Sequence, residues 1–296
     1  PDAELVAMVP TTFDVPAAAS RSLASVGLIT GVESGFSELA FGPQKGEFVH
    51  SLMAGIDAPM VSRWATIMGR RLLVSQMQTP EGISGQQFVA DRAWILLKMG
   101  ESNLARALVQ QVDAGKYSAP LFRVALPVYL AAGDTAGACP LVQGGVDAMK
   151  ADGKDKGKGG GKDWKMMRPI CASLSGEQGR ADALFSSARS QRLATGVDLL
   201  LAEKVIGVSS KRRAVSINWD DVKGMNTWRH GLSLTTGLLP PERLYKDTGP
   251  QTRGWLAVNP AIPAAKRADA ALIAGALGNL SNAAMVSLYA EASGDE

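Results

Sequence analysis

A spacing of glycine, alanine and leucine recurs three times in the middle of the chain and constrains the fold more than any other feature. Alanine follows each glycine after five positions and leucine after eight: Gly100, Ala105, Leu108; Gly133, Ala138, Leu141; and Gly176, Ala181, Leu184. The first two glycines are 33 residues apart and the next two are 43 residues apart. Removing an insertion of about ten residues restores one period, and a period of this length is typical of stacked helical units.

Each repeated unit is predicted to consist of two helices joined at the glycine. An apolar stretch precedes each glycine, and an acid follows it directly: Glu101, Asp134 and Glu177. Glycine tolerates the left-handed backbone that ends a helix, and an acid is stabilised at the positive start of the next helix. We therefore predict an all-α protein, an α-solenoid of antiparallel helical hairpins with irregular C-terminal helices.

The segment KADGKDKGKGGGKDWK, residues 150–165, accounts for the insertion. A phosphate-binding loop would need a glycine five positions before a Gly-Lys pair and a hydroxyl residue after it, and none of the three Gly-Lys pairs here has them. A tail for nucleic acid would not interleave aspartates with its lysines or lack stacking aromatic residues. We predict a flexible Gly/Lys loop at 150–163.

At these residues the chain resembles tetratricopeptide-like (TPR-like) helical repeats, over about residues 85–195. The Gly-Asp/Glu turn followed by alanine matches the turn between the two helices of that family, and Ala93 and Tyr129 fall at two further family positions. The chain also departs from the family, because Pro169 lies inside the third unit and the proline between repeats is missing. Other residues stand where the family has its usual tryptophan: Val89, Phe122 and Lys165. The resemblance implies a superhelix that binds a protein or peptide along its concave face.

The remaining sequence divides around these repeats. We expect an extended N-terminal arm at 1–20, an N-terminal helical pair at 21–84, the TPR-like helical repeats at 85–195 and a C-terminal helical region at 196–296. The pair would comprise helices over 46–58 and 58–78, and five residues of the second would share one face: Val61, Trp64, Ile67, Met68 and Leu72. A longer helix is expected over 218–237, and no segment alternates as a strand would.

Composition and motifs exclude several functional classes. The chain has 31 Lys+Arg against 28 Asp+Glu, and six of the lysines lie in 150–165, so the rest is close to neutral and charge gives no support for nucleic-acid binding. No run of about 18 apolar residues occurs, so we expect no transmembrane segment. The two histidines, His50 and His230, accompany no nucleophile or zinc motif. Glu101 lies in a GES sequence like that of lytic transglycosylases, which have a catalytic glutamate. It occupies the same turn position as Asp134 and Glu177, so we interpret it as an acid at the start of a helix. We expect a non-enzymatic protein without cofactor or metal.

Cys139 and Cys171 are the only cysteines, and they are either buried thiols or one disulfide. Cys139 is expected in the second helix of the second unit and Cys171 in the first helix of the third, and such helices are neighbours in a solenoid. A disulfide between them would stabilise the fold by about 3 to 4 kcal/mol. It would also indicate an oxidising compartment, here the periplasm, whereas two free thiols would indicate the cytoplasm.

Arginines beside tryptophans mark the candidate partner-binding residues: Arg63, Trp64, Arg70, Arg71, Trp228 and Arg229. An amphipathic helix that buries its tryptophan and exposes its arginines would have the same sequence. We expect a scaffold or adaptor for another protein or peptide in a bacterial envelope assembly. The alternatives are a carrier of a lipid or peptidoglycan-like ligand, whose groove the eleven methionines would line, or a non-catalytic domain of a cell-wall enzyme. Neither the identity of the partner nor the oligomeric state follows from the sequence.

Overall fold

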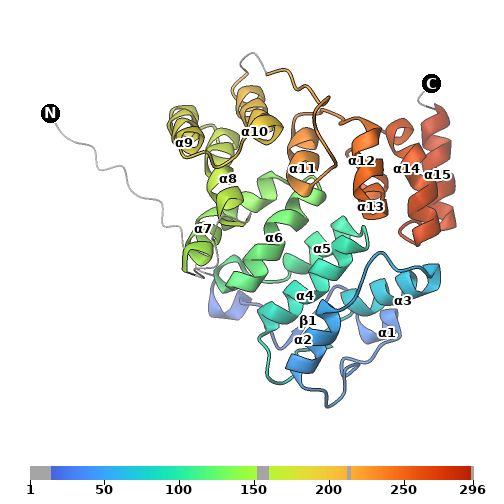
Figure 1. The fold of residues 1–296 in the computed structure, drawn as a ribbon. Coiled ribbons are helices and arrows are strands. Elements are labelled where there is room, and N and C mark those ends of the chain that lie inside the picture. The colour runs from blue at the N-terminus through green and yellow to red at the C-terminus, as the bar shows by residue number, and fades with distance from the viewer. Residues whose placement is uncertain (1–14, 152–159, 212–214, 295–296) are drawn as a thin grey trace.

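The structure is a computed structural model that describes residues 15–151, 160–211 and 215–294. Most of these residues are helical, which confirms the predicted all-α class (Figure 1). The first half contains α1 (Gly31–Ser34), α2 (Gly46–Ala54), α3 (Arg63–Val74), α4 (Gly85–Lys98), α5 (Ser102–Val109), α6 (Ala119–Ala131) and α7 (Val142–Ala151). The second half contains α8 (Gly160–Leu174), α9 (Gln178–Ser190), α10 (Gly196–Ser209), α11 (Thr227–Thr235), α12 (Glu242–Thr248), α13 (Pro250–Val258), α14 (Ala264–Leu277) and α15 (Asn282–Gly294). Within the described ranges there are also three 3₁₀ helices: η1 (Ala17–Ala19), η2 (Ala114–Lys116) and η3 (Ala136–Leu141).

The three repeated glycines adopt the same helix-ending turn. Gly100, Gly133 and Gly176 have φ angles of 89°, 73° and 82°, a region that side chains with a Cβ avoid. In each turn the residue after the glycine donates its N–H to the carbonyl five residues earlier, as Glu101 does to Leu96 at 2.9 Å. The glycine itself donates to the carbonyl three residues earlier, which completes a Schellman motif. The turns join α4 to α5, α6 to η3 and α7, and α8 to α9.

The alanine that follows each of these glycines is fully buried. Ala105, Ala138 and Ala181 are 0% exposed, which agrees with the prediction that a small residue is needed there for close packing. Each acid after the glycine pairs with an arginine: Glu101 with Arg70, Asp134 with Arg106 and Glu177 with Arg180. The acids therefore do more than start a helix, because two of these three pairs connect different parts of the chain.

A small sheet was not expected from the sequence. β1 (Ser25–Val26) pairs antiparallel with β2 (Met77–Gln78), and the strands are too short to show an alternating pattern. Arg92 of α4 holds this region together from a fully buried position. Its guanidinium donates to three carbonyl groups, at 2.8 to 2.9 Å: Val26, Leu73 and Ser75. Burial lowers the pKa of Arg92 to about 9, because the charged form is removed from water.

Several predicted boundaries were wrong. Residues 150–151 of the predicted Gly/Lys loop end α7 and residues 160–163 begin α8, while 152–159 lie outside the described residues. α8 starts early because Trp164 is buried, donates its indole N–H to the Phe122 carbonyl at 3.2 Å and packs on α7, which holds the preceding turn in the helix.

The terminal regions also differ from the prediction. Residues 1–14 of the predicted arm lie outside the described residues, and the short η1 helix follows them. Within 21–84 the structure has three helices and two strands rather than a helical pair. The helix predicted over 218–237 is confined to α11, because Gly224 has a φ of 66° and Asn226 caps the first turn of α11 through its side chain.

The C-terminal helices run back along the earlier ones instead of extending away from them. Figure 1 shows α10 beside α8, α11 beside α6 and α13 beside α5. α14 then contacts α3, near the start of the chain. Helix α6 lies at the centre of this arrangement and contacts α4, α5, α7 and α11. None of the described helices is both long and apolar enough to span a membrane.

Candidate functional site

An open cavity of about 670 Å³ lies between α2, α4 and α6. Ten residues line this α2–α4–α6 cleft: His50, Met53, Ala54, Gln87, Ala90, Asp91, Trp94, Pro120, Arg123 and Val124. Its volume is within the range of ligand-binding clefts in proteins. The lining combines an indole, aliphatic side chains and both signs of charge, so the cleft can contact apolar and polar groups of one ligand.

The α4 and α6 residues of the cleft stand at matching distances before the glycines that end these helices. Gln87, Ala90 and Asp91 stand thirteen, ten and nine residues before Gly100. Three residues of α6 stand at the same distances before Gly133: Pro120, Arg123 and Val124. Residues at these spacings share one face of a helix. The same face of α4 and of α6 is therefore turned toward the cleft.

A hydrogen-bonded histidine–aspartate contact and a half-exposed indole are the main chemical features of the cleft. His50 Nδ1 lies 2.7 Å from the Asp91 carboxylate, which also accepts a hydrogen bond from Gln87 at 2.7 Å. Burial raises the pKa of Asp91, and its hydrogen bonds to His50 and Gln87 act in the opposite direction. Trp94 is 45% exposed, which leaves part of its side chain available for contact with a ligand.

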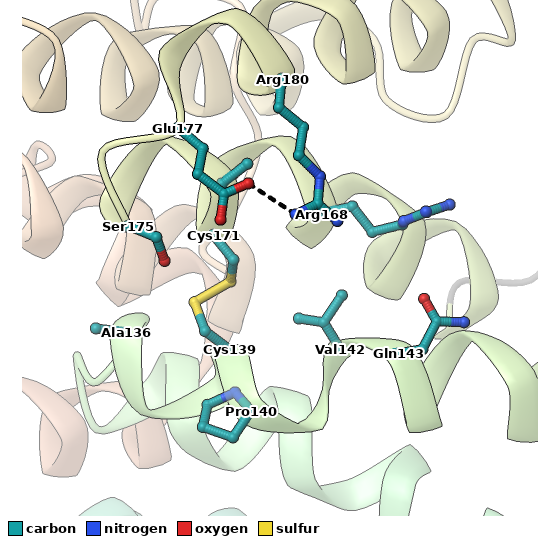
Figure 2. A pocket seen from close by; sticks show the side chains of 11 residues that line it. Ala136, Cys139, Pro140, Val142, Gln143, Arg168, Cys171, Ser175, Glu177 and Arg180 are labelled. Atoms are coloured by element: carbon teal, nitrogen blue, oxygen red, sulfur yellow. Dashed lines mark hydrogen bonds and ion pairs between the residues drawn. A yellow bond between two sulfur atoms is a disulfide. The ribbon is translucent and has the colours of Figure 1, made fainter. Parts of the chain in front are cut away.

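The predicted disulfide between Cys139 and Cys171 is present in the structure. It joins η3 to α8, with 5.5 Å between the Cα atoms. Both cysteines line a second open cavity of about 450 Å³, together with Arg168 and Gln143. Figure 2 shows the disulfide between the two helices, with the ion pair of Glu177 and Arg180 beside it. The bond therefore ties the second helical pair to the third and remains half-exposed.

The candidate partner-binding residues of α3 separate into an exposed and an internal group. Trp64 is 74% exposed, and Arg63 and Arg71 are also exposed. Arg70 instead turns inward, where it pairs with Glu101 at 2.9 Å and donates to the Gly278 carbonyl at 2.9 Å. The helix thus exposes its tryptophan and turns one half-buried arginine inward, the reverse of an ordinary amphipathic helix. Val61 and Met68, expected on a shared face with Ile67 and Leu72, are exposed as well.

Trp228 and Arg229 are occupied by contacts within the protein. Trp228 is 7% exposed and donates its indole N–H to the Asp198 carbonyl at 3.0 Å. Arg229 pairs with the Asp198 carboxylate at 2.8 Å and donates to the carbonyls of Lys223 and Gly224. These two residues fasten α11 to α10, so they do not form one surface with Trp64.

Sequence reasoning did not identify the α2–α4–α6 cleft, although a signal for it exists. Counting back from the two turn glycines places Gln87 with Pro120 and Asp91 with Val124, and this register predicts which faces of α4 and α6 correspond. The position of α2 beside them has no such signal. Comparison of the chain with protein-family models, curated proteins and solved structures found no match.

Proposed function

We propose that this chain is a non-enzymatic scaffold or adaptor of a bacterial envelope assembly that binds a segment of another protein in the α2–α4–α6 cleft. The observation that carries the proposal is that equivalent faces of α4 and α6 line one cavity containing the half-exposed Trp94. Repeated helical pairs that present equivalent residues to one groove are suited to an extended peptide.

The arrangement of the remaining helices favours this cleft over the rest of the repeated surface. α11 packs on α6, and α10 packs on α8, so the C-terminal helices cover those sides of the helical pairs. The cleft faces the other side, toward α2. We accordingly propose that α4 to α9 form a short TPR-like solenoid whose open groove lies at its N-terminal end. The common geometry of the three glycine turns supports this proposal.

The test is selection of peptides from a random library on the immobilised protein, followed by affinity measurement in solution. We expect Trp94→Ala to weaken binding about ten-fold or more, because buried tryptophans dominate interface energetics. The matched control is Tyr289→Ala on α15, an aromatic residue of similar exposure, 40%, far from the cleft. Equal binding by wild type and Trp94→Ala, or an equal loss in both variants, would disprove the assignment.

A carrier function is the second candidate, and the size of the cleft favours it. A cavity of about 670 Å³ can enclose much of a small apolar ligand, such as part of a lipid or a peptidoglycan fragment. Native mass spectrometry of the gently purified protein distinguishes the two functions. A retained mass that is lost in Trp94→Ala would support the carrier, whereas an empty protein that selects peptides would support the adaptor.

The periplasmic location is part of the proposal and depends on the cysteines. A structural disulfide persists in oxidising compartments. Intact mass after alkylation, with and without reductant, on protein taken directly from cells tests it. A bond between Cys139 and Cys171 in the untreated sample supports export, and two alkylated thiols would place the chain in the cytoplasm instead.

A further inference from the structure

α3 and the residue just before its N-cap carry protruding apolar side chains next to two exposed arginines. Trp64 and Met68 are 74% and 58% exposed, and Val61, just before the helix, is 108% exposed. Arg63 and Arg71 are exposed on the same helix. We call these five residues the α3 ridge. Large apolar side chains that project together from a surface mark a site of contact with another protein or a membrane.

The ridge cannot turn inward, because the other side of α3 is fixed. Thr66, Leu73 and Val74 are buried. Arg70 is held by Glu101 and by the carbonyl of Gly278, both in other parts of the fold. The exposure of Trp64 is therefore a consequence of how α3 is anchored.

The charge on the ridge is positive and is not neutralised by neighbours within the described residues. α3 contains three arginines and no acid. Arg63 donates to the Asn282 side-chain oxygen at 3.0 Å, and Arg71 donates to the Glu33 backbone carbonyl at 3.1 Å. Both acceptors are neutral, so both guanidinium charges stay available at the surface. A second copy of the chain docked through the same ridge would bring like charges together.

We propose that the α3 ridge docks the protein on an anionic lipid surface. Val61, Trp64 and Met68 would enter the boundary between headgroups and acyl chains, with Arg63 and Arg71 on lipid phosphates. Amphipathic helices that combine tryptophan and apolar residues with arginine lie in this boundary without spanning the bilayer. A lipid surface also receives protruding side chains without needing a matching groove. The proposal is independent of the function of the α2–α4–α6 cleft.

The test uses the purified chain with phosphatidylcholine vesicles, prepared with and without phosphatidylglycerol. We expect co-sedimentation with the anionic vesicles only, weakened by added salt. Trp64→Ala should reduce the partition coefficient about ten-fold or more, because an exposed indole would lose its apolar contact. The double variant Arg63→Gln, Arg71→Gln, which keeps Trp64, should reduce the partition coefficient relative to wild type by about five-fold for each arginine removed. Subtracting the emission spectrum of Trp64→Phe from that of wild type should give a Trp64 component that shifts to the blue on binding.

The control is Val208→Ala, which removes an apolar side chain of 45% exposure from α10, on the opposite side of the molecule (Figure 1). It should bind vesicles as wild type does. Failure of wild type to bind anionic vesicles at low salt would overturn the proposal, as would equal binding to both vesicle types. Two results would assign the ridge to protein contacts instead. One is a dimer that forms without lipid in sedimentation velocity and requires Trp64. The other is a selected protein partner that competes with the vesicles only when Trp64 is present and that binds the chain more tightly than the vesicles do.

Discussion

His230 shows how strongly burial can change the chemistry of one side chain. It is 0% exposed, and its Nδ1 lies 2.9 Å from the hydroxyl of Tyr245. Its ring packs edge-on against Tyr245, with ring centroids 5.7 Å apart, and also lies against Trp255. Burial lowers the pKa of His230 to about 4, although the Ala131 backbone acts in the opposite direction. The imidazole is therefore a neutral core residue that joins α11 to α12 and α13.

This pKa predicts a loss of stability in acid. An unfolded chain protonates the histidine near pH 6.5, whereas the folded chain resists protonation down to about pH 4. The contribution of His230 is therefore fully present above pH 6.5 and is lost as the pH falls through that window, up to about 3 kcal/mol. Urea denaturation of wild type and His230→Gln over this pH range measures the difference, since other titrating groups cancel. Parallel stability curves would show that His230 is not responsible.

Among the helical connections, the three glycine turns have one backbone geometry but different surroundings. A Cβ on Gly176 would meet nothing within 4 Å. A Cβ on Gly100 would lie 3.1 Å from the backbone of Gln251 and of Gly254, because α13 packs on this turn. The turn itself is a local feature, and the packing around it comes from elsewhere in the chain.

The two turns should respond differently to the same substitution. Gly176→Ala should lower the unfolding free energy by about 1 to 2 kcal/mol, because the left-handed backbone is the only source of strain for alanine there. Gly100→Ala should cost about 3 kcal/mol or more, because two backbone segments must also separate. Urea denaturation of both variants at neutral pH checks the prediction. Equal losses would mean that α13 is not packed on the Gly100 turn.

The overall arrangement depends on a buried polar cluster that joins distant parts of the chain. Glu101 pairs with Arg70 of α3 at 2.9 Å and accepts a hydrogen bond from Asn279 at 3.0 Å. Asn279 also donates to the Met99 carbonyl at 2.8 Å, and Arg70 reaches the Gly278 carbonyl. Burial raises the pKa of Glu101, and the charge of Arg70 opposes this effect. The cluster fastens the turn between α14 and α15 to α3 and to the first glycine turn.

Removing one partner of this ion pair should be costly. Arg70→Met leaves the Glu101 carboxylate buried without its cation, and we expect a loss of about 3 to 5 kcal/mol in unfolding free energy. Adding Glu101→Gln removes the uncompensated charge, so the double variant should regain part of that loss. Urea denaturation of wild type, both single variants and the double variant gives the coupling. Losses that simply add would contradict a direct interaction between the two side chains.

Local sequence determined the features that depend on a few neighbouring residues. The helical class follows from apolar periodicity and glycine spacing, and Gly100, Gly133 and Gly176 do end helices in the conformation that only glycine adopts readily. A disulfide between Cys139 and Cys171 was one of two alternatives that the sequence left open, and the structure has the bond. These inferences needed only distances along the chain.

Tertiary structure alone decided which side of each helix faces water. The sequence of α3 mixes apolar and basic residues. That Trp64 faces water and Arg70 turns inward depends on the buried carboxylate of Glu101 and on the Gly278 carbonyl, 208 positions away in sequence. The start of α8 likewise depends on the burial of Trp164 against α6 and α7. The α2–α4–α6 cleft exists because α2 lies beside α4 while the C-terminal helices return along the other side. Contacts between segments far apart in sequence decide these outcomes. For the cleft, residue spacing indicates only which faces of α4 and α6 correspond, and it does not place α2 beside them.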